Sequence, residues 1–246
     1  MVKYMSLSNN NIVRIWEIAN MQHPVDRAIS ILLEAFPDKS WEELVRLSLG
    51  ERNEFLLSAR ENIFGSRFEG SGICEHCKKG LDFIADADEL RIESDIDRRD
   101  VYKMELDECE IEFRSLNSID LAAVASYKNT KELRKMLAKR SILKMRGDND
   151  ISYDNLGDGL IDALSENLSR IDPMAVMKID LACPECGGDL SLSLDIVSFF
   201  WKEIDAQAKR LMREVNVLAR YYGWSEADIL SMSAARRYYY MEMAEA

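Results

Sequence analysis

Two short cysteine pairs, far apart in the sequence, constrain the fold of this chain more than any other feature. The first pair is Cys74 and Cys77, and the second is Cys183 and Cys186. The two-residue spacing lets both sulfurs of a pair reach one ion from a tight turn, and four thiolates make a closed tetrahedral zinc site. The sequence therefore predicts one structural Zn2+ per chain. Four cysteine ligands leave no open position on the ion, so a catalytic zinc is not expected.

Each cysteine pair leads into a stretch with the alternation of a half-buried β-strand. The alternation after the second pair runs through Leu190, Leu192, Leu194 and Ile196, and a similar pattern begins at Leu81 after the first pair. Two metal-binding turns, each followed by a strand, are the layout of a zinc ribbon. The long stretch between the pairs indicates that a subdomain is inserted between the two halves of the ribbon.

Three other interpretations of the cysteines stay open at the level of sequence. They are a redox-active dithiol, which needs an exposed thiol of low pKa, a disulfide, and unlinked core cysteines. Five cysteines, four of them in pairs, fit a reducing cytoplasm better than a disulfide framework. His76 lies between the first two ligands and is expected to be a solvated turn residue rather than a ligand.

The resulting fold class is α+β and mostly helical, with a discontinuous zinc ribbon. A helical N-terminal arm covers 1–72, and the ribbon is built from 73–84 and 175–196. The insertion of a β-hairpin and helices covers 85–174. A long helix followed by short helices forms the C-terminal arm, 197–246.

Helix signals are clear in the N-terminal arm. Pro24 suits the first turn of one helix. Ser40 and Glu43 form the capping box of the next helix, which Gly50 is expected to end. A third helix is predicted from Arg52 to Phe64.

The insertion is predicted to contain a β-hairpin and a basic helix. Residues 102–106 and 109–113 alternate in polarity about a two-residue turn. Cys109 falls on the buried face and is expected to be a small core residue rather than a reactive thiol. A helix is predicted from Lys131 to Met145.

The most regular helical pattern lies in the C-terminal arm. Apolar residues recur every three or four positions from Ile196 to Tyr222, and Gly223 is expected to end the helix. The apolar stripe of this helix either packs in the core of the protein or forms a surface that binds a partner. Tyrosine is enriched in interface cores, so the tyrosines near the C-terminus are a second candidate contact. The candidate partner-binding residues are Phe200, Ile204, Leu211, Tyr238 and Tyr239.

The charge of the chain argues against most nucleic-acid and membrane partners. The formal net charge is −12, whereas phosphate contacts need clustered lysine and arginine. The strongly basic stretch is Lys131–Arg146, which is either a solvated helix face or a docking surface. No apolar run has the length of a membrane span, and the N-terminus lacks the apolar segment of a secretory signal. The expected location is therefore cytoplasmic.

Motifs of known catalytic chemistry are missing from the sequence. The chain has only two histidines, and neither lies near a serine or cysteine nucleophile with a third orienting residue. A glycine-rich phosphate loop between a strand and a helix is also missing. The sequence therefore predicts a binding or structural protein rather than an enzyme.

Several segments in a fixed order resemble one known family. They are LGERNEFLL (49–57), FRSLNSIDL (113–121), CPECG (183–187), LDIVSFFWKEI (194–204) and YGWSEADIL (222–230). This run resembles the T-even-phage-like baseplate hub assembly chaperone family of contractile phage tails and related phage-derived injection systems.

The resemblance implies a non-enzymatic role. A member of this family would help the baseplate hub, spike or tape-measure proteins of a contractile tail to assemble, and would act by protein-protein binding. After assembly, such a protein either stays in the tail-like particle or is released from it. The alternative is a zinc-ribbon regulator that binds nucleic acid through the basic 131–146 stretch, and a thiol-redox enzyme is the third hypothesis.

Overall fold

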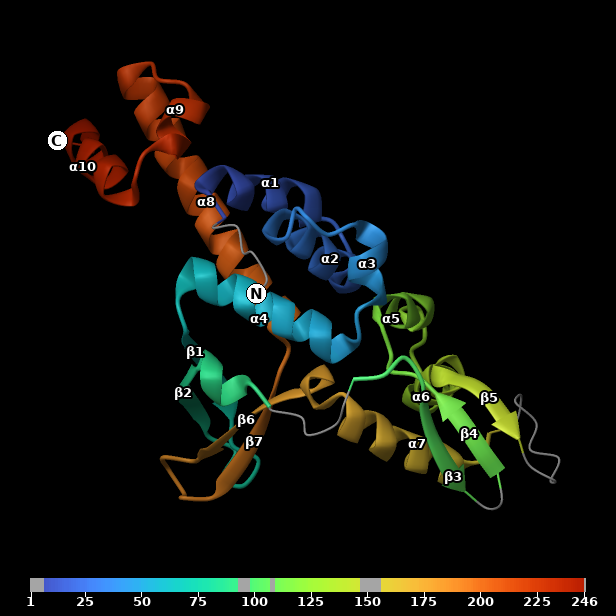
Figure 1. Cartoon of the computed structure of the whole chain (residues 1–246). Helices are drawn as coiled ribbons and strands as arrows, with labels where there is room; N and C mark the ends of the chain where they lie inside the picture. Colours follow the sequence, from blue (N-terminus) through green and yellow to red (C-terminus); the bar gives the residue numbers. More distant parts are fainter. Residues whose placement is uncertain (1–6, 93–97, 107–108, 147–155, 246) are drawn as a thin grey trace.

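The computed structural model describes residues 7–92, 98–106, 109–146 and 156–245 (Figure 1). The chain begins with a group of helices that pack on one another and on the long helix near the C-terminus. These N-terminal helices are α1 (Asn9–Ala19), α2 (Pro24–Ala35), α3 (Trp41–Arg46) and α4 (Leu49–Phe64). The apolar faces of α1, α2 and α4 meet the first part of α8 (Ile196–Tyr222), from Ile196 to Leu211, so helix packing accounts for most of the largest core.

Two β-hairpins follow at one side of this helical body. The first pairs β1 (Arg67–Ile73) with β2 (Gly80–Asp86), and the second pairs β6 (Met177–Ala182) with β7 (Asp189–Leu194). Both pairs are antiparallel, and each cysteine pair lies in the turn that joins its two strands. A short 3-10 helix, η1 (Ala87–Leu90), continues from β2, and a second one, η2 (Pro173–Ala175), precedes β6.

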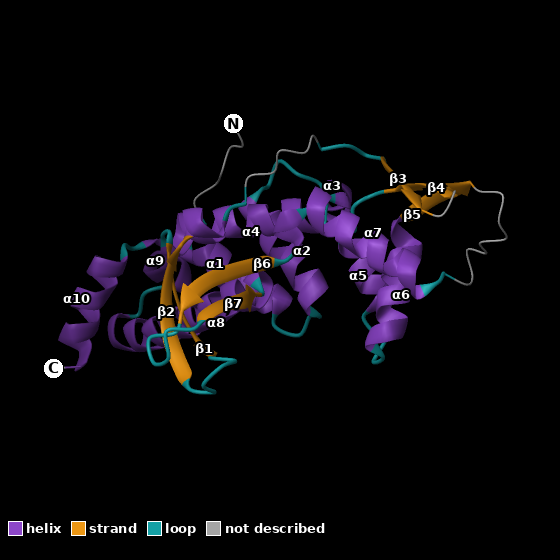
Figure 2. Ribbon diagram, turned by 90° about the horizontal axis from the view of Figure 1, so that it is seen from below, coloured by secondary structure: helices purple, strands orange, loops and turns teal. Residues whose placement is uncertain are grey.

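The segment between the hairpins, which we call the insert, has a core of its own. It contains β3 (Tyr102–Leu106), β4 (Cys109–Phe113), α5 (Ser118–Val124), α6 (Thr130–Ser141), β5 (Ile142–Arg146) and α7 (Asp158–Ile171). The three strands form one antiparallel sheet in the order β3-β4-β5, which lies apart from the two hairpins (Figure 2). Buried side chains from its sheet, α6 and α7 form a cluster separate from that of the helical body. Cys109 is buried in that cluster, as predicted.

The predicted hairpin at 102–113 is confirmed, but its third strand was missed. The basic helix α6 ends at Ser141 rather than Met145, and Ile142–Arg146 pairs with β4 instead. Ile142 is buried opposite Phe113 in this ladder. A helical pattern in the sequence cannot reveal this change, because the pairing partner lies about 30 residues earlier. The turn predicted at residues 107 and 108 lies outside the described residues.

The prediction that Gly50 ends a helix is wrong. Helix α3 ends at Arg46, and Ser48 caps the start of α4 by accepting a hydrogen bond from the backbone N–H of Glu51. Gly50 lies in the first turn of α4, where its N–H donates to Oδ2 of Asp172 at 3.0 Å. A Cβ on residue 50 would overlap the Asp172 carboxylate. The glycine therefore allows a close approach to the end of α7 rather than a helix stop.

The C-terminal arm follows the sequence prediction. Helix α8 ends at Gly223, whose φ of 69° is the left-handed conformation typical of a C-terminal glycine. Short helices α9 (Glu226–Ser231) and α10 (Ala234–Glu245) then turn back onto the end of α8. They lie at the opposite end of the molecule from α6 and α7 (Figures 1 and 2).

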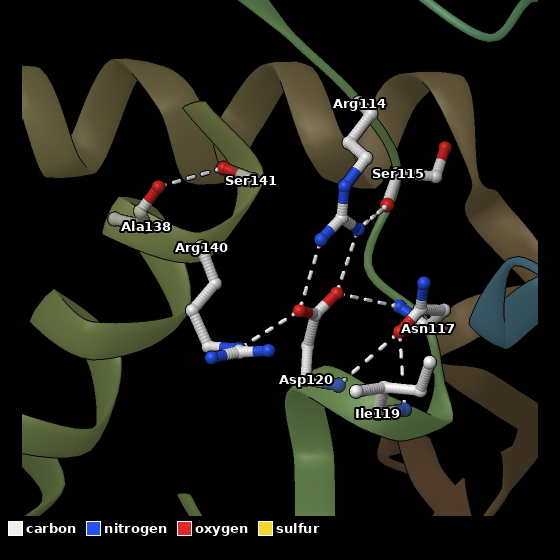
Figure 3. A network of polar contacts seen from close by, with 8 residues as sticks. All are labelled: Arg114, Ser115, Asn117, Ile119, Asp120, Ala138, Arg140 and Ser141. Atoms are coloured by element: carbon white, nitrogen blue, oxygen red, sulfur yellow. Dashed lines mark hydrogen bonds and ion pairs between the residues drawn. The ribbon is translucent and has the colours of Figure 1, made fainter. Parts of the chain in front are cut away.

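A buried carboxylate ties the insert together. Asp120 is fully buried, and its oxygens accept hydrogen bonds from Arg114 (2.7 and 3.0 Å), Arg140 (2.8 Å) and the backbone N–H of Asn117 (3.0 Å; Figure 3). Burial raises the pKa of Asp120, but these hydrogen bonds outweigh it, so the net pKa lies below the ordinary 3.8. Arg140 of the basic helix is therefore held inside the insert.

Replacing Asp120 with asparagine is expected to lower the free energy of unfolding by about 2–3 kcal/mol at pH 7, because two guanidinium groups lose their charged partner. A carboxylate with a depressed pKa stabilises the fold above its unfolded pKa and loses this effect as the pH falls below about 4. The difference between wild type and Asp120→Asn should therefore shrink on acidification, as measured by urea unfolding at pH 7 and pH 3.

The matched control is Asp162→Asn. Asp162 bonds Arg134 at 2.7 Å, but both side chains are at least half exposed, so this change should cost less than about 0.5 kcal/mol. Equal losses in the two variants would show that the Asp120 cluster does not stabilise the insert.

Candidate metal centre

The two cysteine turns have the same backbone hydrogen bonds. In the first turn, the N–H of Lys78 donates to the carbonyl of Cys74 at 2.8 Å, and the N–H of Cys74 donates to the carbonyl of Lys79 at 2.9 Å. In the second turn, Gly187 donates to Cys183 at 2.9 Å, and Cys183 donates to Gly188 at 2.8 Å. The two turns therefore present their cysteines in equivalent ways.

The residue after the second cysteine of each turn has a left-handed backbone. Gly187 has a φ of 70°, as its lack of a Cβ readily permits. Lys78 has a φ of 60° at the equivalent place in the first turn, where a side chain makes this conformation less favourable. The turn geometry is thus kept in both hairpins although only one has glycine there.

The four cysteine sulfurs converge on one point. Each lies within 4.8 Å of the other three. Two sulfur pairs, Cys74 with Cys186 and Cys77 with Cys183, are each 3.8 Å apart. Metal–sulfur bonds of about 2.3 Å in a tetrahedron place the sulfurs about 3.8 Å from one another. The cluster therefore has the dimensions of a tetrahedral metal site, and each close pair joins one hairpin to the other.

Cys74 and Cys186 differ in how readily their thiols ionise, because their surroundings differ. Backbone N–H groups of Cys77 and His76 point at Cys74 and lower its pKa to about 6, although burial opposes them. The N–H of Gly188 lowers the pKa of Cys186, but the neighbouring thiols and burial outweigh it and raise this pKa to about 11. The Cys74 thiolate therefore forms readily, whereas the neighbouring sulfurs oppose ionisation of Cys186. A bound cation favours the fully ionised set.

Residues other than the cysteines also make contacts between the two hairpins. The Nε2–H of His76 donates to the backbone carbonyl of Asp189 at 3.1 Å, and Lys79 pairs with Glu185 at 2.5 Å. His76 is exposed and is not part of the sulfur cluster, so the interpretation as a turn residue holds, with a hydrogen bond that the sequence did not predict. These contacts arise only when the two turns face each other, and local sequence carries no signal for them.

Apolar side chains next to the sulfur cluster also pack the two hairpins against each other. Cys74, Cys183, Leu81 and Leu190 form a small buried cluster. Leu192 of β7 approaches Gly72 of β1 so closely that a Cβ there would lie 2.7 Å from a Leu192 methyl carbon. The hairpins therefore stack face to face, with the sulfur cluster at one end. A cluster this small provides little hydrophobic stabilisation of its own.

The candidate partner residues fall into two groups. Phe200, Ile204 and Leu211 are fully buried in the core of the helical body, which is the core alternative that their spacing had left open. A partner has no access to them in this structure. Tyr238 and Tyr239 are 66% and 63% exposed on α10, so the partner proposal is carried forward for these two residues.

No helix in the described part of the chain combines the length and the apolar character needed to span a bilayer.

Comparison with known proteins gives one family. The family model described as "T4 bacteriophage base plate protein" matches residues 15–201, which is well over half of the chain and includes both cysteine pairs. No curated protein matches the chain, and no solved structure matches it.

Proposed function

Because the chain belongs to the T4 bacteriophage base plate protein family, we propose that it is a non-enzymatic assembly chaperone or scaffold for the baseplate hub of a contractile tail-like particle. Membership of a baseplate family indicates a structural role, and the family match is the observation that carries the proposal. Hub, spike or tape-measure proteins are the proposed partners. The proposed division of the chain keeps the insert as a separate subdomain within 85–174.

The metal we propose is Zn2+. Cys74, Cys77, Cys183 and Cys186 would hold it, and a d10 ion without redox chemistry suits a closed site of four thiolates. Tetrahedral sulfur sites also take iron, so the identity of the metal is part of the test. The role of these residues is to cross-link two hairpins that lie far apart in the sequence. This rigid joint would hold the insert against the helical body.

The alternative function, binding of nucleic acid through residues 131–146, has less support. Arg134 pairs with Asp162, and Arg140 pairs with the buried Asp120. Charges used within the molecule are less available for phosphate groups, and the chain as a whole carries a net charge of −12. Salt-sensitive binding of a DNA or RNA duplex that Lys135→Glu abolishes would restore this alternative.

Tyr238 and Tyr239 are the proposed partner-contact residues. Replacing both with alanine is expected to remove most of the tail or hub protein that co-purifies with the tagged chain from the cells that make it, because exposed aromatic side chains contribute strongly to interfaces. Quantitative mass spectrometry of the purified complex measures this loss.

The control is Tyr127→Ala, which removes another exposed tyrosine, after α5 in the insert. This variant should retain the partner. An unchanged partner yield in the Tyr238/Tyr239 variant would exclude α10 as the contact, and the lack of any tail protein with the wild type would contradict the chaperone proposal.

A further inference from the structure

An open apolar groove lies where the insert meets the helical body. Its volume is about 510 Å³, and α4, α5, α6, α7 and the start of β6 all contribute to it. Leu49, Leu137 and Leu168 form part of its wall. Val176 and Ile92 are also in its lining, and they are 53% and 46% exposed. Exposed aliphatic side chains around a groove are typical of a binding site.

The charged residues at this groove are mostly basic. Lys178 is exposed and forms no ion pair with any described residue. Arg134 faces the groove from α6, with only an exposed pairing to Asp162. Asp172 also lines the groove, but its oxygens are occupied by Ser48 and the N–H of Gly50. An occupant of this groove should therefore combine apolar side chains with a carboxylate.

Helix α10 offers these features on its outer face. Tyr238, Tyr239 and Met243 are 66%, 63% and 41% exposed. Glu242 lies among them, one helical turn from Tyr238, and its carboxylate raises the pKa of the Tyr238 hydroxyl. The outer face of α10 is thus mostly apolar, with Glu242 at its centre and the exposed Arg236, whose guanidinium lies over the Tyr240 ring, at its edge.

The inner face of α10 is held firmly on the end of α8. Arg237 is 1% exposed, donates to Glu214 at 2.6 Å and also donates to the carbonyl of Met232 at 2.5 Å. The ring of Tyr240 packs edge-on against those of Tyr222 and Trp224. The outer face is therefore presented on a fixed helix, which reduces the entropic cost of binding.

We propose that the outer face of α10 in one copy of the chain docks into the groove beside Val176 and Lys178 of a second copy. This inference rests on the proposed contact role of Tyr238 and Tyr239, and because a hub protein would use the same two side chains, one α10 face holds either a hub protein or a second copy. Tyrosine rings and Met243 would fill the groove, and Glu242 would approach Lys178. Helix α10 lies far from α5, α6 and α7, which line the groove, so one chain cannot make the contact with itself (Figure 1).

A contact between two different surfaces has a structural consequence. Each copy keeps one groove and one α10 face, so the contact repeats head to tail until a ring closes or a filament extends. The contact is small, and its strength should be in the weak range of about 1–100 µM. Self-association should therefore depend on protein concentration.

Sedimentation velocity with two complementary variants tests the proposal. The metal-loaded wild type should form dimers and larger species between about 5 and 200 µM. Val176→Glu breaks the groove and Tyr239→Glu breaks the α10 face, and both positions are more than half exposed, so folding should be unaffected. Each variant alone should remain monomeric, whereas an equimolar mixture should form a dimer and nothing larger, because only one intact contact remains.

Charge reversal provides a second test. Lys178→Glu and Glu242→Lys should each weaken association by about tenfold or more, and the double variant should recover it. Met21→Glu is the control, because Met21 is 93% exposed and lies outside both surfaces. A wild type that stays monomeric at about 200 µM, or a mixture of the two broken variants that forms no dimer, would overturn the inference. A monomeric wild type that still binds a hub protein through Tyr239 would leave the proposed function intact.

Discussion

Replacing Cys183 with serine is expected to release the metal and to lower the melting temperature by more than about 10 °C, where 1 kcal/mol corresponds to about 2–4 °C for a chain of this size. The cluster beneath the cysteine turns is small, so a bound metal would supply most of the stability of the paired hairpins. Buried residues of β1 and β6, such as Phe68 and Met177, also belong to the core of the helical body. Loss of the hairpins should therefore weaken the body as well.

The matched control is Cys109→Ala. Cys109 is buried in the insert, away from the sulfur cluster, so this variant should keep one metal ion per chain with only a modest loss of stability. Calorimetry and hydrogen exchange of both variants check the prediction, and exchange should rise first in β1, β2, β6 and β7 of Cys183→Ser. Equal melting temperatures for Cys183→Ser and wild type would show that the fold does not depend on the metal.

Replacing Arg60 with methionine is expected to lower the free energy of unfolding by about 3 kcal/mol, the lower end of the range for breaking a buried ion pair. Arg60 is 3% exposed and donates two hydrogen bonds to Glu203 of α8, at 2.9 and 2.6 Å. It also donates to the carbonyl of Gly65 at 2.6 Å, and its guanidinium carbon lies 3.8 Å from the centre of the Phe68 ring. One side chain thus joins α4, α8 and β1.

The control for Arg60 lies on α8 itself. Lys209 pairs with Asp205 at 2.8 Å but is 56% exposed, so Lys209→Met should cost less than about 1 kcal/mol. The double variant Arg60→Met, Glu203→Leu should regain part of the loss, because no buried charge is then left without a partner. Urea unfolding of the four proteins measures these differences. An Arg60→Met loss no larger than that of Lys209→Met would show that this contact does not join the three elements.

Features with a local physical signal could be predicted from the sequence. The cap at Ser40 and the glycine at the end of α8 act within one helical turn, so their residues are adjacent in the sequence. The cysteine pairs likewise carry their geometry in a four-residue motif, with two residues between the cysteines. Cys109 was placed correctly because strand alternation fixes which face a residue occupies.

Features that depend on distant segments could not be predicted. Strand β5 forms because β4 lies beside it, and Gly50 is required because Asp172 approaches α4 from far along the chain. The apolar stripe of α8 has the same spacing whether it packs inside or faces a partner, so Phe200 and Ile204 could not be assigned to the core from periodicity. Likewise, the hydrogen bond of His76 to the second hairpin depends on how the two turns meet.

We propose that one zinc ion, held by Cys74, Cys77, Cys183 and Cys186, joins the two hairpins. A native mass spectrum of the full chain, purified gently without added metal or chelator, shows directly whether this ion is present. We expect one zinc per wild-type chain, one per Cys109→Ala chain and none in Cys183→Ser. A metal-free wild type whose mass shows the loss of hydrogens to disulfides would contradict the claim and favour a redox role, and a chain that carries iron instead would contradict the assignment of zinc.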